Sequence, residues 1–300
     1  MKGTMRQSLL LLLGCCILFA TEAQAEIVTR IIGGEISDEN AWPATVALSM
    51  DDQFCGGTLV DRRWVVTAAH CLFGQNGSRL PEEKMSVLAG SSQLNSPDMQ
   101  KIMVTNSYVH PDYDLSRLDY DVALLELATD ADLPAMPIYM NPDVPAVGTM
   151  ATVVGWGITE ESDTVVNDLR EIEVPIISNE TCNDPESYNG IITSNMMCAG
   201  YAEGGRDACN GDSGGPLMVY KDGAWRLTGV VSFGYERCAE PDKYGVYMRI
   251  SAFVRWLDLY VQSGVADDRD DDGGGGGFGP GFLLFLALFA IPGLRRVGRY

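Results

Sequence analysis

Short apolar runs separated by turn-forming residues dominate the chain between residues 31 and 264. Runs this brief, rich in β-branched side chains and bounded by Asn, Asp, Gly and Pro, predict β-strands. The strand candidates are residues 44–48, 57–60, 64–66, 150–154 and 227–231. Apolar residues recur at helical spacing in residues 252–262, which predicts a terminal helix packed on a barrel rather than a cofactor or membrane face. The pattern as a whole predicts an all-β, barrel-type fold.

The N-terminal end departs from this pattern. Lys2 and Arg6 precede a mostly apolar stretch, residues 8–20, and residues 23–25 read A-Q-A. We interpret residues 1–25 as a secretory signal peptide, because the apolar run is too short for a membrane span and is followed by a small-residue cleavage site. A faint resemblance of residues 12–15 to a bacterial lipoprotein box is the weaker alternative.

The C-terminal end combines a charge run, a glycine run and an apolar segment. Residues 267–272 are mostly Asp, residues 273–277 are all Gly, and residues 278–294 are apolar but interrupted by Gly and Pro; three arginines follow, Arg295, Arg296 and Arg299. We interpret residues 265–277 as a solvated linker. Residues 278–300 form a separate tail, which is only a marginal candidate for a membrane span.

The charge balance narrows the classes of function. The chain has 41 Asp and Glu residues against 21 Lys and Arg, a formal net charge of −20. This balance argues against nucleic-acid binding, which needs a basic surface to meet the phosphates. It is compatible with attraction of cationic substrates, although solubility alone would also explain it.

Three separated motifs carry candidate chemistry. Residues 211–216 read G-D-S-G-G-P, His70 stands in the sequence T-A-A-H-C, and Asp121 directly precedes an apolar run. A serine hydroxyl is a weak nucleophile until an imidazole accepts its proton, and the imidazole needs a carboxylate to orient it. Of the nearby acids Asp112, Asp114, Asp119 and Asp121, only Asp121 stands where a carboxylate can be buried at the start of a strand.

These motifs resemble the trypsin/chymotrypsin family of serine proteases over roughly residues 31–264, and the resemblance implies the mechanism of that family. The resemblance implies two six-stranded antiparallel β-barrels with a C-terminal helix and the active site in the cleft between the barrels. It assigns Ser213 as nucleophile, His70 as general base and Asp121 as the orienting acid. It also assigns the N–H groups of Gly211 and Ser213 to the oxyanion hole.

The same resemblance implies a specificity pocket. Asp207 would form its floor, and Gly234 and Gly245 would leave its walls open, so the site would select Arg or Lys at the cleaved bond. Ala208 offers no hydroxyl to a Lys ammonium, which favours Arg over Lys. A surface role for Asp207 beside Arg206 is the weaker alternative. Two further residues are assigned to more distant subsites, Phe233 and Leu118.

Activation by proteolysis is a further implication. Residues 26–30 form a short prosegment, and cleavage after Arg30 would release the amine of Ile31 to pair with the carboxylate of Asp212. Because Arg30 itself suits the expected specificity, the activating protease is either another enzyme or a second copy of this one.

The cysteines and histidines complete the assignments. Of eight cysteines, two lie in the signal peptide, and the other six could pair in fifteen ways. The resemblance selects Cys55–Cys71, Cys182–Cys198 and Cys209–Cys238, and Ala151 and Val219 occupy the places of a further bridge found in many relatives. No cofactor is implied. We expect no metal site, since His110 is assigned a structural role and residues 91–97 lack the acids that calcium needs.

The tail resembles bacterial GlyGly-CTERM sorting tails. This resemblance implies removal of the tail by a rhomboid-type intramembrane protease and export by type II secretion, giving a secreted or cell-surface enzyme. A retained membrane anchor is the main alternative, and a GPI signal is disfavoured by the terminal arginines. In another class of function, the chain would be a protease-like binding module, but such homologues usually lose a member of the triad.

Overall fold

The computed structural model describes residues 33–261 except 51–52, 140–144, 160–163 and 236. The chain divides into one compact unit, Met1–Gly264, and a second segment, Val265–Tyr300, which lies outside the described residues. The predicted signal peptide, prosegment, linker and tail therefore fall outside the described residues, and their boundaries remain predictions. Within the described part of the chain, no helix is long and apolar enough to cross a membrane.

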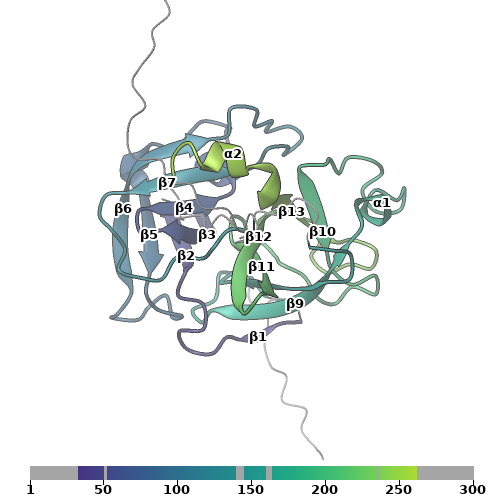
Figure 1. Ribbon diagram of the computed structural model, residues 1–300, viewed down its shortest axis with the longest axis horizontal. Coiled ribbons are helices and arrows are strands. Elements are labelled where there is room, and N and C mark those ends of the chain that lie inside the picture. Colours follow the sequence, from purple (N-terminus) through teal and green to yellow (C-terminus); the bar gives the residue numbers. More distant parts are fainter. Residues whose placement is uncertain (1–32, 51–52, 140–144, 160–163, 236, 262–300) are drawn as a thin grey trace, which may run out of the picture. The chain divides into compact units, whose positions relative to one another are not determined.

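The first half of the unit is a closed antiparallel barrel (Figure 1). Its six strands follow the order β2-β3-β4-β7-β6-β5, and β2 also pairs with β5 to close the ring. Closure leaves no unpaired strand edge. The strands are β2 (Thr45–Met50), β3 (Gln53–Asp61), β4 (Trp64–Thr67), β5 (Met85–Ala89), β6 (Gln100–Val109) and β7 (Ala123–Leu127).

The second half forms a second antiparallel barrel beside the first (Figure 1). Its order is β9-β10-β13-β12-β11-β8, and pairing of β8 with β9 closes it, while the short β1 (Glu35–Ile36) adds to β9. The strands are β8 (Met150–Gly155), β9 (Arg170–Ile177), β10 (Met196–Ala199), β11 (Pro216–Lys221), β12 (Ala224–Phe233) and β13 (Gly245–Arg249). The predicted fold of two six-stranded barrels is confirmed.

Alternation of buried and exposed positions explains these strands. In β9 the buried residues occur at every second position along the eight residues, which is the period of a strand with one face on a core. The short apolar runs, such as β7, are buried at four of five positions because they lie deep in a barrel. Each fully buried Leu or Val contributes about 1.5–3 kcal/mol relative to exposure.

In the described residues the helices are few and short: η1 (Ala69–Leu72), η2 (Glu82–Lys84), α1 (Asn179–Cys182), η3 (Ile250–Ala252) and α2 (Val254–Leu257). A helix was predicted over residues 252–262, but among the described residues the α-helix here, α2, covers Val254–Leu257. The preceding residues form the 3₁₀ turn η3, and Phe253, with ψ near 0°, separates this turn from α2. Its packing is as predicted, since Trp256 is buried and the ring of Tyr260 lies 4.4 Å from that of Tyr108 on β6.

Several contacts join the barrels. In the connecting segment, residues 128–149, the N–H of Met136 donates to the carbonyl of Leu59 on β3 at 2.8 Å. The carbonyl of the next residue, Pro137, accepts from the N–H of Leu227 on β12, also at 2.8 Å. Independently, the N–H of Gly56 on β3 donates to the carbonyl of Ser213 at 2.7 Å. The loop that carries Ser213 is therefore held by both barrels.

Candidate active site

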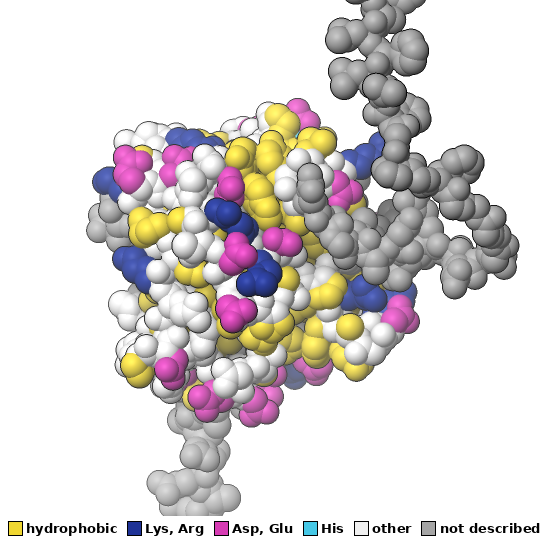
Figure 2. Space-filling view, turned by 60° about the vertical axis from the view of Figure 1, so that its left-hand side comes forward, with side chains coloured by type: hydrophobic (Ala, Val, Ile, Leu, Met, Phe, Trp, Pro, Cys, Tyr) yellow, Lys and Arg dark blue, Asp and Glu magenta, His cyan; other side chains and the backbone are white. Residues whose placement is uncertain are grey.

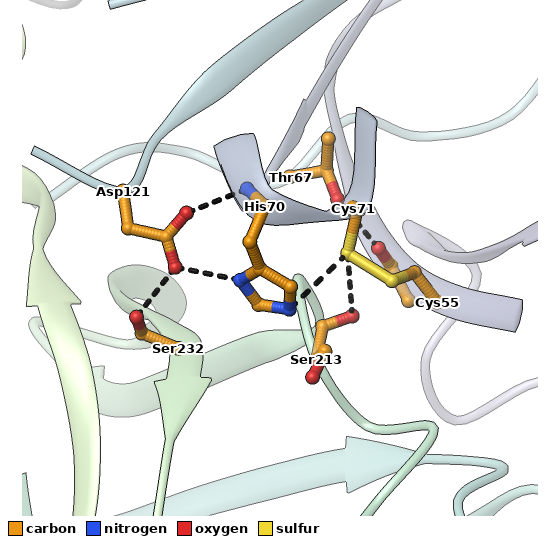
Figure 3. Close-up of polar contacts among 8 residues, drawn as sticks. Cys55, Thr67, His70, Cys71, Asp121, Ser213 and Ser232 are labelled. Carbon is orange, nitrogen blue, oxygen red and sulfur yellow. Dashed lines mark hydrogen bonds and ion pairs between the residues drawn. A yellow bond between two sulfur atoms is a disulfide. The ribbon is translucent and has the colours of Figure 1, made fainter. Parts of the chain in front are cut away.

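His70 and Asp121 form a pair at the edge of the first barrel. His70 lies on η1, and Asp121 lies just before β7, where it is completely buried. One carboxylate oxygen accepts from the backbone N–H of His70 at 2.7 Å, and the other lies 2.7 Å from Nδ1 of the ring (Figure 3). With the Nδ1 proton donated to Asp121, Nε2 of a neutral ring is left as the proton acceptor.

The electrostatic balance at His70 favours protonation. Burial of the imidazole lowers its pKa, but the negative charge of Asp121 and its hydrogen bond raise it by more, so the pKa of His70 lies above its ordinary value of 6.5. The ring therefore has the basicity that a general base near neutral pH needs.

Ser232 supplies a third contact to this pair, which the sequence reasoning missed. Its hydroxyl, on β12 of the second barrel, donates to Oδ2 of Asp121 at 2.5 Å (Figure 3). The carboxylate thus accepts bonds from both barrels. A signal was available in the sequence, because Ser232 is a polar residue between Val231 and Phe233 in an otherwise apolar run.

Ser213 lies on the Nε2 side of His70 (Figure 3). Nε2 lies 3.8 Å from the sulfur of Cys71, which is in turn 3.7 Å from the carbonyl oxygen of Ser213. Among the described residues, no direct hydrogen bond joins the hydroxyl of Ser213 to His70. Such bonds are often long in unliganded sites and shorten when substrate binds.

The backbone around Ser213 exposes two hydrogen-bond donors. Within the described part of the chain, neither the N–H of Gly211 nor that of Ser213 has an acceptor. Gly211 adopts φ of +94°, which strains any residue with a side chain, and a Cβ there would lie 3.0 Å from Cα of Gly157. The two N–H groups are thus available for an oxyanion.

Asp212, between these donors, points into the protein. It is completely buried and accepts from the N–H groups of Gly157 at 2.8 Å and Cys209 at 2.9 Å. Burial raises its pKa to about 6, and the two hydrogen bonds oppose that rise. The predicted partner of this carboxylate is the amine of Ile31, released by cleavage after Arg30. Both residues lie outside the described residues.

A cavity of about 300 Å³ opens beside Ser213. It lies among residues of β12, β13 and the loops that precede β11 and β13. The cavity is lined by every residue predicted for the specificity pocket, namely Asp207, Ala208, Gly234 and Gly245. Ser213, Phe233, Tyr247 and both cysteines of the Cys209–Cys238 disulfide also line it.

Asp207 is the charged group of this cavity. The residue is 3% exposed, and its Oδ1 has no hydrogen-bond partner among the described residues. Burial raises the pKa of Asp207 to about 7, opposed by weak hydrogen bonds from backbone N–H groups, of which that of Ala239 lies 3.4 Å from Oδ2. A buried carboxylate with an unused acceptor requires a cation to stabilise its charge.

The remaining predicted residues lie in different places. Phe233 forms part of the cavity wall and contacts the ring of Tyr188 edge-on at 5.9 Å. Leu118 is half-buried with φ of +50°, and it is not among the residues that line this cavity. His110 stacks on Tyr120 at 4.9 Å, and burial lowers its pKa, as suits a packing residue.

The six cysteines of the described part of the chain form disulfides with the expected pairing, Cys55–Cys71, Cys182–Cys198 and Cys209–Cys238. The first places its sulfur beside His70, and the third lies in the cavity wall. Cys55, His70 and Cys71 bring potential metal ligands within 4.8 Å of one another. Both sulfurs are consumed by the disulfide, so they cannot act as thiolate ligands.

Known proteins are similar to this chain in sequence. The family model named Trypsin matches residues 31–257. Trypsin-2 of Salmo salar is 40% identical over 243 residues, which cover 80% of this chain and 96% of the relative. Trypsin of Xenopus laevis is 37% identical, and the match covers 85% of this chain and 98% of the relative. The clotting factor G beta subunit of Tachypleus tridentatus is 36% identical, and the match covers 77% of this chain and 79% of the relative. The chain therefore belongs to the trypsin family and is a serine endopeptidase.

Proposed function

We propose that this endopeptidase cleaves peptide bonds after Arg and, less readily, after Lys. The observation that carries the proposal is the buried, incompletely hydrogen-bonded carboxylate of Asp207 in the same cavity that Ser213 lines. A guanidinium can meet such a carboxylate with two parallel hydrogen bonds, whereas an ammonium is a point charge. Ala208 supplies no hydroxyl to complete the coordination of Lys, which favours Arg.

The proposed reaction is acyl transfer to water through the three residues beside the cavity. Ser213 attacks the scissile carbonyl while Nε2 of His70 accepts its proton, and Asp121 holds the ring and stabilises its positive charge. The N–H groups of Gly211 and Ser213 donate to the developing oxyanion. His70 then protonates the leaving amine, and water repeats the sequence on the acyl-enzyme.

Surface charge supports a cationic substrate over a nucleic acid. The net charge is −20. On the face in Figure 2, acidic and basic side chains are interspersed, and the described side chains form no continuous basic area there. The field of such a surface attracts Arg- or Lys-containing peptides and repels phosphates.

The enzyme is proposed to be made as a zymogen. Cleavage after Arg30 would deliver the amine of Ile31 to Asp212, whose complete burial leaves its charge without a cationic partner among the described residues. An activated enzyme would therefore gain order in the Ser213 loop. Arg30→Gln protein that is fully active with residues 26–30 attached would contradict this step.

Export and tail removal complete the proposal. The signal peptide would direct the chain out of the cytoplasm, and the tail would be cut off by an intramembrane protease after export. The relatives described above are animal proteins and the family match ends at residue 257, so this part rests on the sequence of the tail alone. Mass spectrometry of the mature C-terminus tests it, since protein retaining Arg295 and Arg296 would show a kept anchor.

Matched chromogenic peptides ending in Arg, Lys or Phe test the activity itself. Protein comprising residues 26–272 is assayed before and after limited tryptic cleavage, with Ser213→Ala as the control. Activity on Arg that requires cleavage at Arg30 supports the catalytic residues, the pocket and the switch together. No hydrolysis by protein with a verified Ile31 terminus would favour a binding module or a very narrow specificity.

A further inference from the structure

Asp119 lies two residues before Asp121, in the loop between β6 and β7, and it reaches the second barrel. Its Oδ1 accepts from the hydroxyl of Thr193 at 3.1 Å and from Nδ2 of Asn195 at 3.0 Å. Both donors belong to the segment that leads into β10. The sequence predicts burial for Asp121 alone among the acids of this loop, but Asp119 is half-buried and bridges the two barrels.

The donors on the second barrel are themselves fixed. The carbonyl of Thr193 accepts from the side-chain amide of Asn179 on α1 at 2.8 Å. The carbonyl of Asn195 accepts from the backbone N–H of Arg249 at 2.8 Å. Asp119 is therefore attached to a rigid part of the second barrel rather than to a loose loop.

The backbone on both sides of Asp119 is strained. Leu118 has φ of +50° and Tyr120 has φ of +53°, a region that residues with side chains rarely adopt. Such conformations persist only when the surroundings impose them. Here Oδ1 of Asp119 also accepts from the N–H of Tyr120 at 2.9 Å, so the same oxygen holds the strained residue and the second barrel.

This strain acts on the position of Asp121. Asp121 follows Tyr120 directly, and its carboxylate must contact His70 at 2.7 Å while accepting from Ser232 of the second barrel. If Tyr120 relaxed to an ordinary conformation, the direction of the chain into Asp121 would change. Errors of about 1 Å in catalytic geometry can cost about 100-fold in rate.

We propose that Asp119 is a positioning residue that ties the strained loop to the second barrel and thereby holds Asp121 in place against His70. The proposal rests on the catalytic roles proposed above. Asp119 contacts neither His70 nor the cavity, so its loss should lower kcat without weakening the binding of a cation in the cavity.

The test compares Asp119→Ala with Asp119→Asn and with a matched control, Asp112→Ala. Asp112 is exposed in the same loop and carries the same charge. We measure kcat and KM on an Arg chromogenic peptide, with active enzyme counted by burst titration, and the inhibition constant of benzamidine as a probe of the cavity. Thermal unfolding is followed in parallel.

We expect Asp119→Ala to lower kcat about 10- to 100-fold while the benzamidine constant changes little. Asp119→Asn keeps an acceptor oxygen and should restore most of kcat, and Asp112→Ala should match the wild type. Thr193→Ala and Asn195→Ala each remove one donor, and combining them should reproduce the loss in kcat if Asp119→Ala does not fold.

The proposal is overturned if Asp119→Ala, or the Thr193 and Asn195 double variant, keeps the wild-type kcat per active site and only unfolds at lower temperature. Equal losses in kcat and benzamidine affinity would also overturn it, because they would indicate general damage. An inactive wild type, by contrast, would refute the proposed function before Asp119 is examined.

Discussion

Replacing Asp207 with Asn removes the charge of the cavity with almost no change in volume. Asp207 is 3% exposed, and its Oδ1 has no hydrogen-bond partner among the described residues. Removing one partner of a buried ion pair costs about 3–5 kcal/mol, or roughly 10²–10⁴ in kcat/KM at 1.4 kcal/mol per tenfold. Substrates with Arg should lose this factor in Asp207→Asn, whereas a Phe substrate should change little.

The same substitution should increase stability above neutral pH. The folded-state pKa of Asp207 is about 7, above the ordinary 3.8, so burial of this group carries no ionisation penalty below pH 3.8. The penalty grows as pH rises from 3.8, where the unfolded chain ionises, and is complete once pH has passed through 7. The ionised carboxylate then weakens folding by as much as about 4 kcal/mol at pH 8, taking about 1.4 kcal/mol per pKa unit. Asn carries no such penalty.

Thermal unfolding in a Ser213→Ala background, which prevents self-digestion, measures this effect. Asp207→Asn should raise the Tm at pH 8 and leave it nearly unchanged at pH 4. Binding of benzamidine should also release about half a proton at pH 7, because a group with that pKa is half protonated there. A lower Tm at pH 8, or binding without proton release between pH 6 and 8, would refute the assignment of Asp207 as the buried anionic partner.

Other parts of the site make separate predictions. The rise of kcat/KM with pH on a Phe substrate should have its midpoint above pH 6.5, because Asp121 raises the pKa of His70 and the ring must be neutral to accept a proton. A midpoint below 6.5 would contradict this. Ser232→Ala removes a donor 2.5 Å from Asp121 and should lower kcat about tenfold, as losing a hydrogen bond to a charged group costs about 1.5–3 kcal/mol; an unchanged kcat would count against it. Gly234→Val should raise KM for Arg substrates without unfolding the protein, since the nearest atom to a Cβ at this position is Oδ2 of Asp207, at 3.8 Å. An unaltered KM would show that the Arg side chain binds elsewhere.

Local sequence patterns predicted some of the strands. The five candidate runs lie in or overlap β2, β3, β4, β8 and β12. The strand β9 was missed because it begins with the buried Arg170 and contains Pro175, and both obscure its alternation. Closure of each barrel depends on pairing of strands far apart in the chain, such as β2 with β5, for which no local signal exists.

The candidate site was predictable where a motif marked it. The family resemblance located His70, Asp121 and Ser213, whereas Ser232 and Asp119 act through contacts with segments far away in the sequence. A hydroxyl or carboxylate in a loop carries no sign of its distant partner. In sequence, Asp119 resembles the other acids before β7, and only the positions of its partners Thr193 and Asn195 in the fold distinguish it.

The composition of the segment that connects the barrels affects how the enzyme would be degraded by autolysis. Residues 128–149 contain neither Lys nor Arg. With the proposed specificity for Arg and Lys, the enzyme would not cleave this connection between β7 and β8. In a concentrated solution of active molecules, autolysis should therefore begin at exposed basic residues elsewhere, and the barrels should stay covalently linked until late in self-digestion.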